Sequence, residues 1–324
     1  MSFFDCITKP LTLIVVLGLI AACSKSDNSP GVFVDTKMDS LVTAEWLSEH
    51  LNDPDLVVLD CTVLVEPTSD GDFRIVNGRA HYEEGHIPTA GFADLMGDLS
   101  VGDSAIQFAV PTPERFATAM SALGVSDDSR VVLYDASGSA WAARVWWMLR
   151  WIGFDQVALL DGGLAAWTAH DQSLSTEPVD RPAGTLTVAL RPELIVDKDE
   201  VLAAIGDDSV NIIDALSEAQ YRGEMSMYAR PGHIPGASNV PMMSLLDETG
   251  RYRPMDELDE LLVGDRDTRS ITYCGGGIAA SANAFAMTRV GYQDVAVYAA
   301  SLQEWAADAS LPMEVAPDLK SISD

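Results

Sequence analysis

The chain has 324 residues, of which 48% are hydrophobic, and 49 acidic against 20 basic residues give it a formal net charge of −29 at pH 7. The acidic residues are spread along the chain, so its surface repels polyanions, which argues against nucleic acid as a partner. The sequence contains no metal-ligand spacing, no phosphate loop with a lysine and no dinucleotide fingerprint, so we expect neither a metal nor a cofactor.

The N-terminal segment is typical of a leader. Residues 11–22 form an apolar stretch that is shorter than the roughly 20 residues of a membrane-spanning helix. The stretch ends in Ile20-Ala21-Ala22-Cys23 and resembles a bacterial lipoprotein signal, in which Cys23 becomes the lipidated first residue; ordinary secretion or an unusual N-terminus is the alternative. Because Ser24 follows, we expect a lipid-anchored protein of the cell envelope, at the outer membrane and facing the periplasm.

An internal repeat follows the leader. Residues 56–60 match 210–214, residues 85–88 match 232–235, and residues 132–135 match 271–274, all in the same order. Trp167 follows Asp135 by 32 positions and Trp305 follows Cys274 by 31, so the copies keep their register to within one residue. Each copy alternates β-rich runs with amphipathic helical segments, which predicts an α/β fold of two tandem domains, each a mainly parallel sheet flanked by helices.

The expected boundaries follow from the repeat and from composition. Residues 173–192 contain three prolines and a glycine and are therefore predicted to link the two domains. The expected order is a signal peptide at 1–23, a tether at 24–37, a first domain at 38–172, the linker at 173–192, a second domain at 193–314 and a tail at 315–324.

The segment 271–281 is the most informative part of the chain. An apolar strand runs into Cys274, three glycines and then a helix. Glycines allow backbone N–H groups to turn inward, and the N-terminus of a helix favours negative charge, so the loop predicts a cradle for a nucleophilic thiolate. The alternative is a small buried side chain on a glycine turn. Cys61, which directly follows a predicted strand in the first copy, is interpreted as a small buried core residue.

The two copies differ at the position of this cysteine. The first copy carries Asp135 there and lacks a nucleophile, so we expect the second domain to be catalytic and the first to be a scaffold. A cleft between the two copies is the expected site for a small ligand.

Several motifs in order resemble the tandem rhodanese family, the thiosulfate and 3-mercaptopyruvate sulfurtransferases. They are 113–125, 143–150 and 160–167 in the first copy and the cysteine loop in the second, and the resemblance covers residues 36–314. It implies that catalytic Cys274 takes sulfane sulfur from an anionic donor, holds it as a persulfide and passes it to cyanide or a thiol. The persulfide loop then comprises Cys274, Gly275, Gly276, Gly277, Ile278 and Ala279. Storing the sulfur covalently divides the transfer into two easier displacements.

Departures from the family pattern limit the prediction of the donor. The loop has no basic residue, and Gly276 and Ala279 replace a serine and a threonine of the family. Gln220 stands where the family has a substrate-binding arginine, so Arg222 or Arg230, with Arg74 as the next candidate, is expected to bind an anionic donor.

Two histidines occur in the repeated Gly-His-Ile-Pro segments. The resemblance implies a possible proton relay of His86 with Asp72; the alternative, that His86 hydrogen-bonds its own turn, is favoured because both copies carry the histidine. We expect His233 to be structural.

Two other functions compete with sulfur transfer. A phosphatase of this fold needs an arginine six positions after the cysteine, and the chain has Ala280 there. A non-catalytic sulfur-binding or interaction module remains the alternative, because the loop serine and threonine are missing and residues 298–301 depart from the family pattern.

Overall fold

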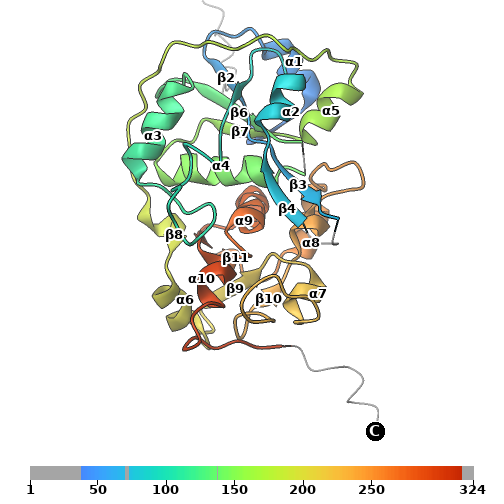
Figure 1. The fold of residues 1–324 in the computed structure, drawn as a ribbon. Coiled ribbons are helices and arrows are strands. Elements are labelled where there is room, and N and C mark those ends of the chain that lie inside the picture. Colours follow the sequence, from blue (N-terminus) through green and yellow to red (C-terminus); the bar gives the residue numbers. More distant parts are fainter. Residues whose placement is uncertain (1–37, 70–72, 137, 316–324) are drawn as a thin grey trace, which may run out of the picture. The chain divides into compact units, whose positions relative to one another are not determined.

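The computed structural model describes residues 38–69, 73–136 and 138–315. In these residues the internal repeat appears as two five-stranded parallel sheets (Figure 1). The first sheet comprises β1 (Leu41–Val42), β2 (Leu56–Asp60), β5 (Gly91–Phe92), β6 (Arg130–Tyr134) and β7 (Val157–Leu160), and the second comprises β8 (Ile195–Val196), β9 (Val210–Asp214), β10 (Ser238–Asn239), β11 (Arg269–Tyr273) and β12 (Val295–Tyr298).

The two sheets have the same topology. The strand order is β1-β7-β6-β2-β5 in the first and, read in the matching direction, β8-β12-β11-β9-β10 in the second. The central pairs also share a register, because Asp60 lies opposite Tyr134 and Asp214 lies opposite Tyr273. The predicted fold of two tandem α/β domains with parallel sheets is therefore confirmed.

Helices cover both faces of each sheet. In the first half these are α1 (Ala44–His50), α2 (Arg79–Glu84), α3 (Pro113–Ala122), α4 (Ala140–Trp151) and α5 (Gly163–Ala169). The second half has the short 3-10 helices η1 (Pro192–Leu194) and η2 (Met242–Leu245), with α6 (Lys198–Ala204), α7 (Glu218–Tyr221), α8 (Met255–Leu261), α9 (Ile278–Val290) and α10 (Ser301–Trp305). Local sequence sets several of these starts: the Thr43 and Thr112 side chains cap α1 and α3, and Asp197 with Glu200 forms a capping box at α6.

The alternation of side chains along a strand divides the core into layers. Leu56 and Val58 of β2 pack with α1 and α5 on the outer face of the first sheet. Val57 and Leu59 point the other way, into a core that continues through α4 and α9 to the inner face of the second sheet. The buried strands carry apolar residues on both faces, as parallel sheets covered by helices require.

Helices α4 and α9 join the two halves and lie side by side in Figure 1. The Trp146 ring of α4 meets the Phe285 ring of α9 edge-on, with centroids 5.0 Å apart. Both helices are almost entirely buried, so the halves share one hydrophobic core. This packing brings the N-termini of α4 and α9 to the same region.

A two-stranded antiparallel hairpin interrupts the first half and was not anticipated from the sequence. It consists of β3 (Val63–Pro67) and β4 (Phe73–Asn77). Among the described residues the second half has no matching hairpin.

The expected membrane anchor cannot be compared with the fold, because the leader and Cys23 lie outside the described residues. Among the helices of residues 38–69, 73–136 and 138–315, none has the length and apolar character needed to cross a bilayer.

Candidate active site

Cys274 lies at the carboxyl end of β11, where the chain turns into α9. Its side chain is almost buried, with 3% of its surface exposed. The backbone N–H of Gly277 donates a hydrogen bond to Cys274 Sγ at 3.1 Å. A main-chain donor is thus already directed at the sulfur, as the glycine loop predicted, and it can stabilise negative charge on a thiolate or persulfide.

Glycine suits the three consecutive loop positions 275–277 for two reasons, close neighbours at the first two and backbone conformation at the third. A Cβ atom on Gly275 would lie 1.7 Å from the Tyr228 hydroxyl, and one on Gly276 would lie 2.4 Å from Gln303 Nε2. Gly277 has a φ of +79°, in the left-handed region that favours glycine. Gly275 and Gly276 therefore let Tyr228 and Gln303 approach the loop backbone, and Gly277 provides the left-handed turn into α9.

A buried cation supports this loop from the first half. Arg144 of α4 is 1% exposed and donates hydrogen bonds to the carbonyl oxygens of Phe108 at 2.9 Å and Gly277 at 3.4 Å. Burial lowers the pKa of Arg144 to about 10, so the guanidinium stays charged at neutral pH. It lies close enough to Cys274 for a negative sulfur to interact with it electrostatically.

Ser301 fixes the backbone of Cys274 through its hydroxyl group. Its hydroxyl accepts a hydrogen bond from the Cys274 N–H at 3.0 Å and donates one to the Tyr298 carbonyl at 2.6 Å. Ser301 begins α10 and has a φ of +52°, an uncommon conformation for a residue other than glycine. The strained serine thus holds the residue that carries the reactive sulfur.

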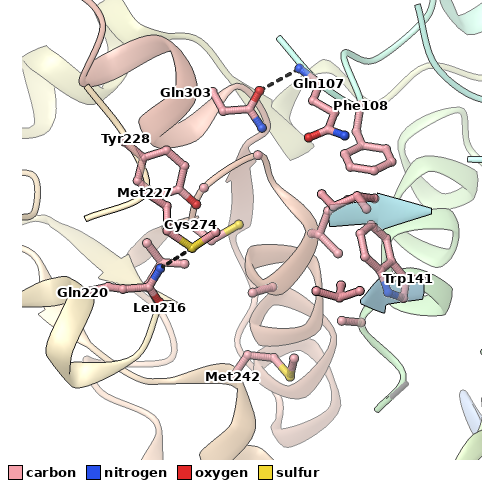
Figure 2. A pocket seen from close by; sticks show the side chains of 17 residues that line it. Gln107, Phe108, Trp141, Leu216, Gln220, Met227, Tyr228, Met242, Cys274 and Gln303 are labelled. Carbon is pink, nitrogen blue, oxygen red and sulfur yellow. Dashed lines mark hydrogen bonds between the residues drawn. The ribbon is translucent and has the colours of Figure 1, made fainter. Parts of the chain in front are cut away.

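A cavity of about 710 Å³ opens above Cys274, between the two halves of the chain. Figure 2 shows Phe108 and Trp141 of the first half on one side and Met227 and Tyr228 of the second half on the other. The hairpin strands also contribute to the wall, through Val65 and Ile75. The expected cleft between the copies is present, and loop residues Gly275, Gly276, Ile278 and Ala279 lie on its wall.

Two glutamines connect the halves at the cavity. The backbone N–H of Gln107 donates to Gln303 Oε1 at 2.6 Å, and both residues line the cavity (Figure 2). Tyr228 is half-buried here; burial, and then the charge of Cys274, raise the pKa of its hydroxyl above the ordinary value. The phenol therefore stays protonated at neutral pH and can donate a hydrogen bond.

The structure does not bring the predicted arginines to the cavity wall. Arg222 pairs with Glu218 on exposed α7 at 3.2 Å, and Arg74 pairs with Glu66 across the hairpin at 2.6 Å. Arg230 donates to four backbone carbonyl oxygens, those of Trp305, Ala306, Asp308 and Leu311. Because its donors are used to hold the end of α10, Arg230 serves the fold here, and a role of these arginines in donor binding stays a prediction.

His86, one member of the predicted proton relay, does not line the cavity either. His86 is 1% exposed, its Nδ1 lies 2.9 Å from the Tyr82 carbonyl oxygen, and its ring stacks on Tyr82. His233 repeats this arrangement with Tyr221, its Nδ1 lying 2.7 Å from that carbonyl oxygen. This is the local, structural role that the repeated motif favoured; Asp72 lies outside the described residues.

Cys61 is buried in the first half, as expected of a core residue. Burial raises the pKa of the Cys61 thiol well above its ordinary value, so this thiol is unreactive. No group of three or more potential metal ligands occurs in the part of the chain that the structure describes.

Sequence reasoning missed Arg144, Tyr228, Ser301 and Gln303. Arg144 lies within the run 143–150 that carried the family resemblance, but nothing in that run indicates that its side chain reaches the loop of the other domain. Ser301 lies 27 residues after Cys274, and only the folded chain brings the two together.

The sequence of this chain is similar to those of known proteins. Residues 43–170 and 197–308 each match the model of the rhodanese-like domain. The chain is 37% identical over 279 residues to the 3-mercaptopyruvate sulfurtransferase of Escherichia coli (strain K12), which covers 84% of this chain and 97% of the relative. It is 30% identical over 276 residues to the thiosulfate sulfurtransferase of Gallus gallus, with 82% of this chain and 93% of the relative covered.

A solved structure agrees with these relatives. The crystal structure of SseA from Escherichia coli, described as having the rhodanese fold of 3-mercaptopyruvate sulfotransferases, superposes with a TM-score of 0.72 and 35% identity. The match covers 81% of this chain and 98% of that one. The chain therefore belongs to the rhodanese-like sulfurtransferase family and is a sulfurtransferase.

Proposed function

We propose that Cys274 carries the transferred sulfur as a persulfide, with 3-mercaptopyruvate or thiosulfate as the donor and cyanide or a thiol as the acceptor. The observation that carries this proposal is the Gly277 N–H directed at Cys274 Sγ, at the base of a cavity between the halves. The named substrates come from the relatives, which are 3-mercaptopyruvate and thiosulfate sulfurtransferases.

In the first step the Cys274 thiolate attacks the sulfane sulfur of the donor. With thiosulfate the S–S bond breaks and its electron pair leaves on sulfite; with 3-mercaptopyruvate the C–S bond breaks and the carbon takes up the thiol proton, giving pyruvate. Both routes leave a negative persulfide on Cys274 and need no oxidant or reductant. The Gly277 N–H and the charge of Arg144 stabilise that product, since both act on a largely water-excluded sulfur.

Intact-mass spectrometry of the full-length chain tests the carrier. After treatment with donor the mass is expected to rise by one sulfur atom and to return on addition of cyanide, with the extra sulfur mapped to the peptide containing Cys274. The Cys274→Ser variant should form no such adduct, whereas Cys61→Ser, which changes a buried thiol in the first half, should behave as the wild type. A sulfur-loaded Cys274→Ser protein, with the adduct mapped elsewhere, contradicts the proposal.

We also propose that the chain is anchored in the bacterial outer membrane through lipid on Cys23, facing the periplasm. The support is the sequence alone: an apolar stretch that ends in Ile20-Ala21-Ala22-Cys23 and is followed by a serine. The full-length product should partition into detergent, and Cys23→Ala should move to the aqueous phase or accumulate as precursor. Equal partitioning of the two proteins argues for ordinary secretion.

A further inference from the structure

We infer that Tyr228 is a further catalytic residue, whose hydroxyl supplies the proton that 3-mercaptopyruvate takes up when it gives its sulfur to Cys274. This inference rests on the proposed persulfide function and concerns its first step with one of the two donors. The donors differ in their need for such a proton, which makes the role testable.

The two proposed donors release different groups when their sulfur passes to Cys274. Thiosulfate releases sulfite, which holds the electron pair of the broken S–S bond and needs no proton to depart. 3-Mercaptopyruvate releases the enolate of pyruvate, and the former methylene carbon must gain a proton to become the methyl group of pyruvate. An acid placed next to the reacting sulfur therefore accelerates transfer from 3-mercaptopyruvate and not from thiosulfate.

Four polar side chains from both halves of the chain line the cavity: Gln107, Gln220, Tyr228 and Gln303 (Figure 2). Three of them are amides, which donate hydrogen bonds but do not give up a proton at neutral pH. Among the described residues that line the cavity there is no Asp, Glu, His, Lys or Arg. In this part of the wall Tyr228 is thus the one side chain besides Cys274 that carries an acidic proton.

The Tyr228 hydroxyl lies beside the reactive loop. A Cβ atom on Gly275, the residue after Cys274, would lie 1.7 Å from this oxygen, so the hydroxyl rests against the loop backbone. Figure 2 shows the Tyr228 side chain next to Cys274 at the wall of the cavity. Burial, and then the charge of Cys274, raise the pKa of the hydroxyl above its ordinary value. It therefore keeps its proton until a strong base, such as the enolate, forms beside it.

Among the described residues the Tyr228 hydroxyl has no hydrogen-bond partner. The hydrogen bonds of Tyr228 are made by its backbone, and both are with Ser226. Tyr221 on the same segment differs, because its hydroxyl donates to the Ala237 carbonyl oxygen at 2.6 Å. The Tyr221 hydroxyl thus holds the fold, whereas that of Tyr228 is left to a molecule in the cavity.

The proton returns to Tyr228 within the same half-reaction. The Cys274 thiolate attacks the thiol sulfur of 3-mercaptopyruvate and forms an S–S bond, while the C–S bond breaks and its electron pair passes to the carbon. That carbon takes the proton of the Tyr228 hydroxyl, so the carbon is reduced and the transferred sulfur is oxidised. The thiol proton, left on the outer sulfur of the persulfide, then passes to the Tyr228 phenolate, which is the stronger base. The products are pyruvate, a negative persulfide and the original phenol, and no further reactant is needed.

Tyr228→Phe keeps the ring and removes the proton. Full-length protein is mixed with either donor, and persulfide formation is followed by quenching and intact-mass spectrometry. A general acid contributes about 10²–10⁴-fold, so at saturating 3-mercaptopyruvate we expect the rate to fall about a hundredfold, with little change in the half-saturating concentration. With thiosulfate we expect a fall of at most about threefold, because sulfite needs no proton, so the ratio of the two rates should shift about thirtyfold or more.

Tyr221→Phe is the matched control. It removes a hydroxyl that bonds within the fold, so it should lower stability and leave the ratio of the two rates at the wild-type value. Equal losses with both donors in Tyr228→Phe would make the hydroxyl a partner of the negative sulfur, and a loss confined to the half-saturating concentration would make it a donor-binding group. Either result overturns the inference, as does the same shift in Tyr221→Phe.

Failure of the proposed function has a different signature. If neither donor loads Cys274, the persulfide proposal fails and the role of Tyr228 fails with it. If thiosulfate alone loads the wild type, or if Tyr228→Phe slows both donors alike, the carrier role of Cys274 stands and the assignment of Tyr228 is wrong. In variants without the Tyr228 hydroxyl, thiosulfate remains the donor whose transfer reports on the loop itself.

Discussion

The loops after β6 and β11 occupy equivalent places in the two halves, yet only one of them presents a reactive group. In the first half Asp135 accepts backbone hydrogen bonds from Ser139 at 3.0 Å and from Ala142 at 2.9 Å. In the second half the Gly277 N–H donates to Cys274 Sγ. Both loops therefore direct main-chain donors at a side chain that can be negative. In the first half the Asp135 carboxylate accepts these hydrogen bonds. Because a carboxylate stands in the place of the cysteine, that loop has no thiol nucleophile.

The loops also differ in length by one residue. Helix α4 begins five residues after Asp135, and α9 begins four residues after Cys274. Beyond the helix starts the spacing is equal, because β7 and β12 both begin 17 residues later. The one-residue difference in tryptophan spacing thus lies in these loops. The shorter, glycine-only loop brings a main-chain donor to the sulfur.

The largest effect on activity is expected from a substitution that fills the space between Gly275 and the Tyr228 side chain. Gly275→Ala places a Cβ atom 1.7 Å from the Tyr228 hydroxyl, whereas the corresponding residue of the first loop is already Ala136. We expect kcat/KM for sulfur transfer to fall at least a hundredfold, about 3 kcal/mol in transition-state stabilisation, because the loop or Tyr228 must move. The measurement is a steady-state cyanide assay.

The first half supplies the control for this change. Ala136→Gly alters the equivalent loop position and should leave kcat/KM unchanged. If the clash with Tyr228 is the cause, combining Gly275→Ala with Tyr228→Ala should recover part of the loss. Full activity in Gly275→Ala alone would show that the close approach of Tyr228 is not needed.

A smaller effect on activity is expected from replacing Arg144, whose side chain reaches from α4 in the first half to the cysteine loop in the second. Arg144→Met removes a buried charge near Cys274 but keeps a side chain of similar length in α4. An opposite charge stabilises a negative sulfur, so its loss should lower kcat/KM for sulfur transfer roughly tenfold near neutral pH in the steady-state cyanide assay.

Arg150 is a matched control on the same helix. Its guanidinium pairs with Asp155 at 3.5 Å and lies over the Trp146 ring, away from the loop. Arg150→Met should affect stability and leave kcat/KM close to that of the wild type. An unchanged kcat/KM in Arg144→Met would limit Arg144 to holding the Gly277 and Phe108 carbonyl oxygens.

Local patterns in the sequence were sufficient for the fold and for the nucleophile. Apolar runs, their repetition in order and the strand-Cys-glycine-helix segment predicted two parallel α/β domains and the position of Cys274. These features depend on periodicity and on backbone conformation, which a sequence displays directly. The spacing of the two tryptophans even recorded the length difference between the loops.

Long-range contacts could not be predicted in the same way. Arg144 lies 133 residues from Gly277 in sequence, and its contact depends on the angle at which α4 packs on α9. One of the arginines expected to bind the donor shows the reverse problem: Arg230 is near the repeated motif in sequence, but its side chain holds the segment from the end of α10 to Leu311 through four carbonyl oxygens. Proximity in sequence does not report where a long side chain finds its partners.

The last expected effect is on stability, not on activity, and concerns a feature that both halves share, a buried carboxyl at the end of a central strand. Burial raises the pKa of Asp214 to about 6 and raises that of Asp60 in the same direction. A carboxyl in the unfolded chain titrates near 3.9, so the folded state binds this proton more tightly and the free energy of unfolding falls as pH rises through 6. Asp214→Asn keeps an oxygen for the Leu216 N–H and removes the titration. Relative to the wild type, it should therefore gain about 2 kcal/mol of stability at pH 7.5 and less at pH 5, as measured by urea unfolding at each pH. Asp60→Asn should shift stability in the same direction. A difference between Asp214→Asn and the wild type that does not change with pH would mean that Asp214 remains ionised in the folded protein down to pH 5.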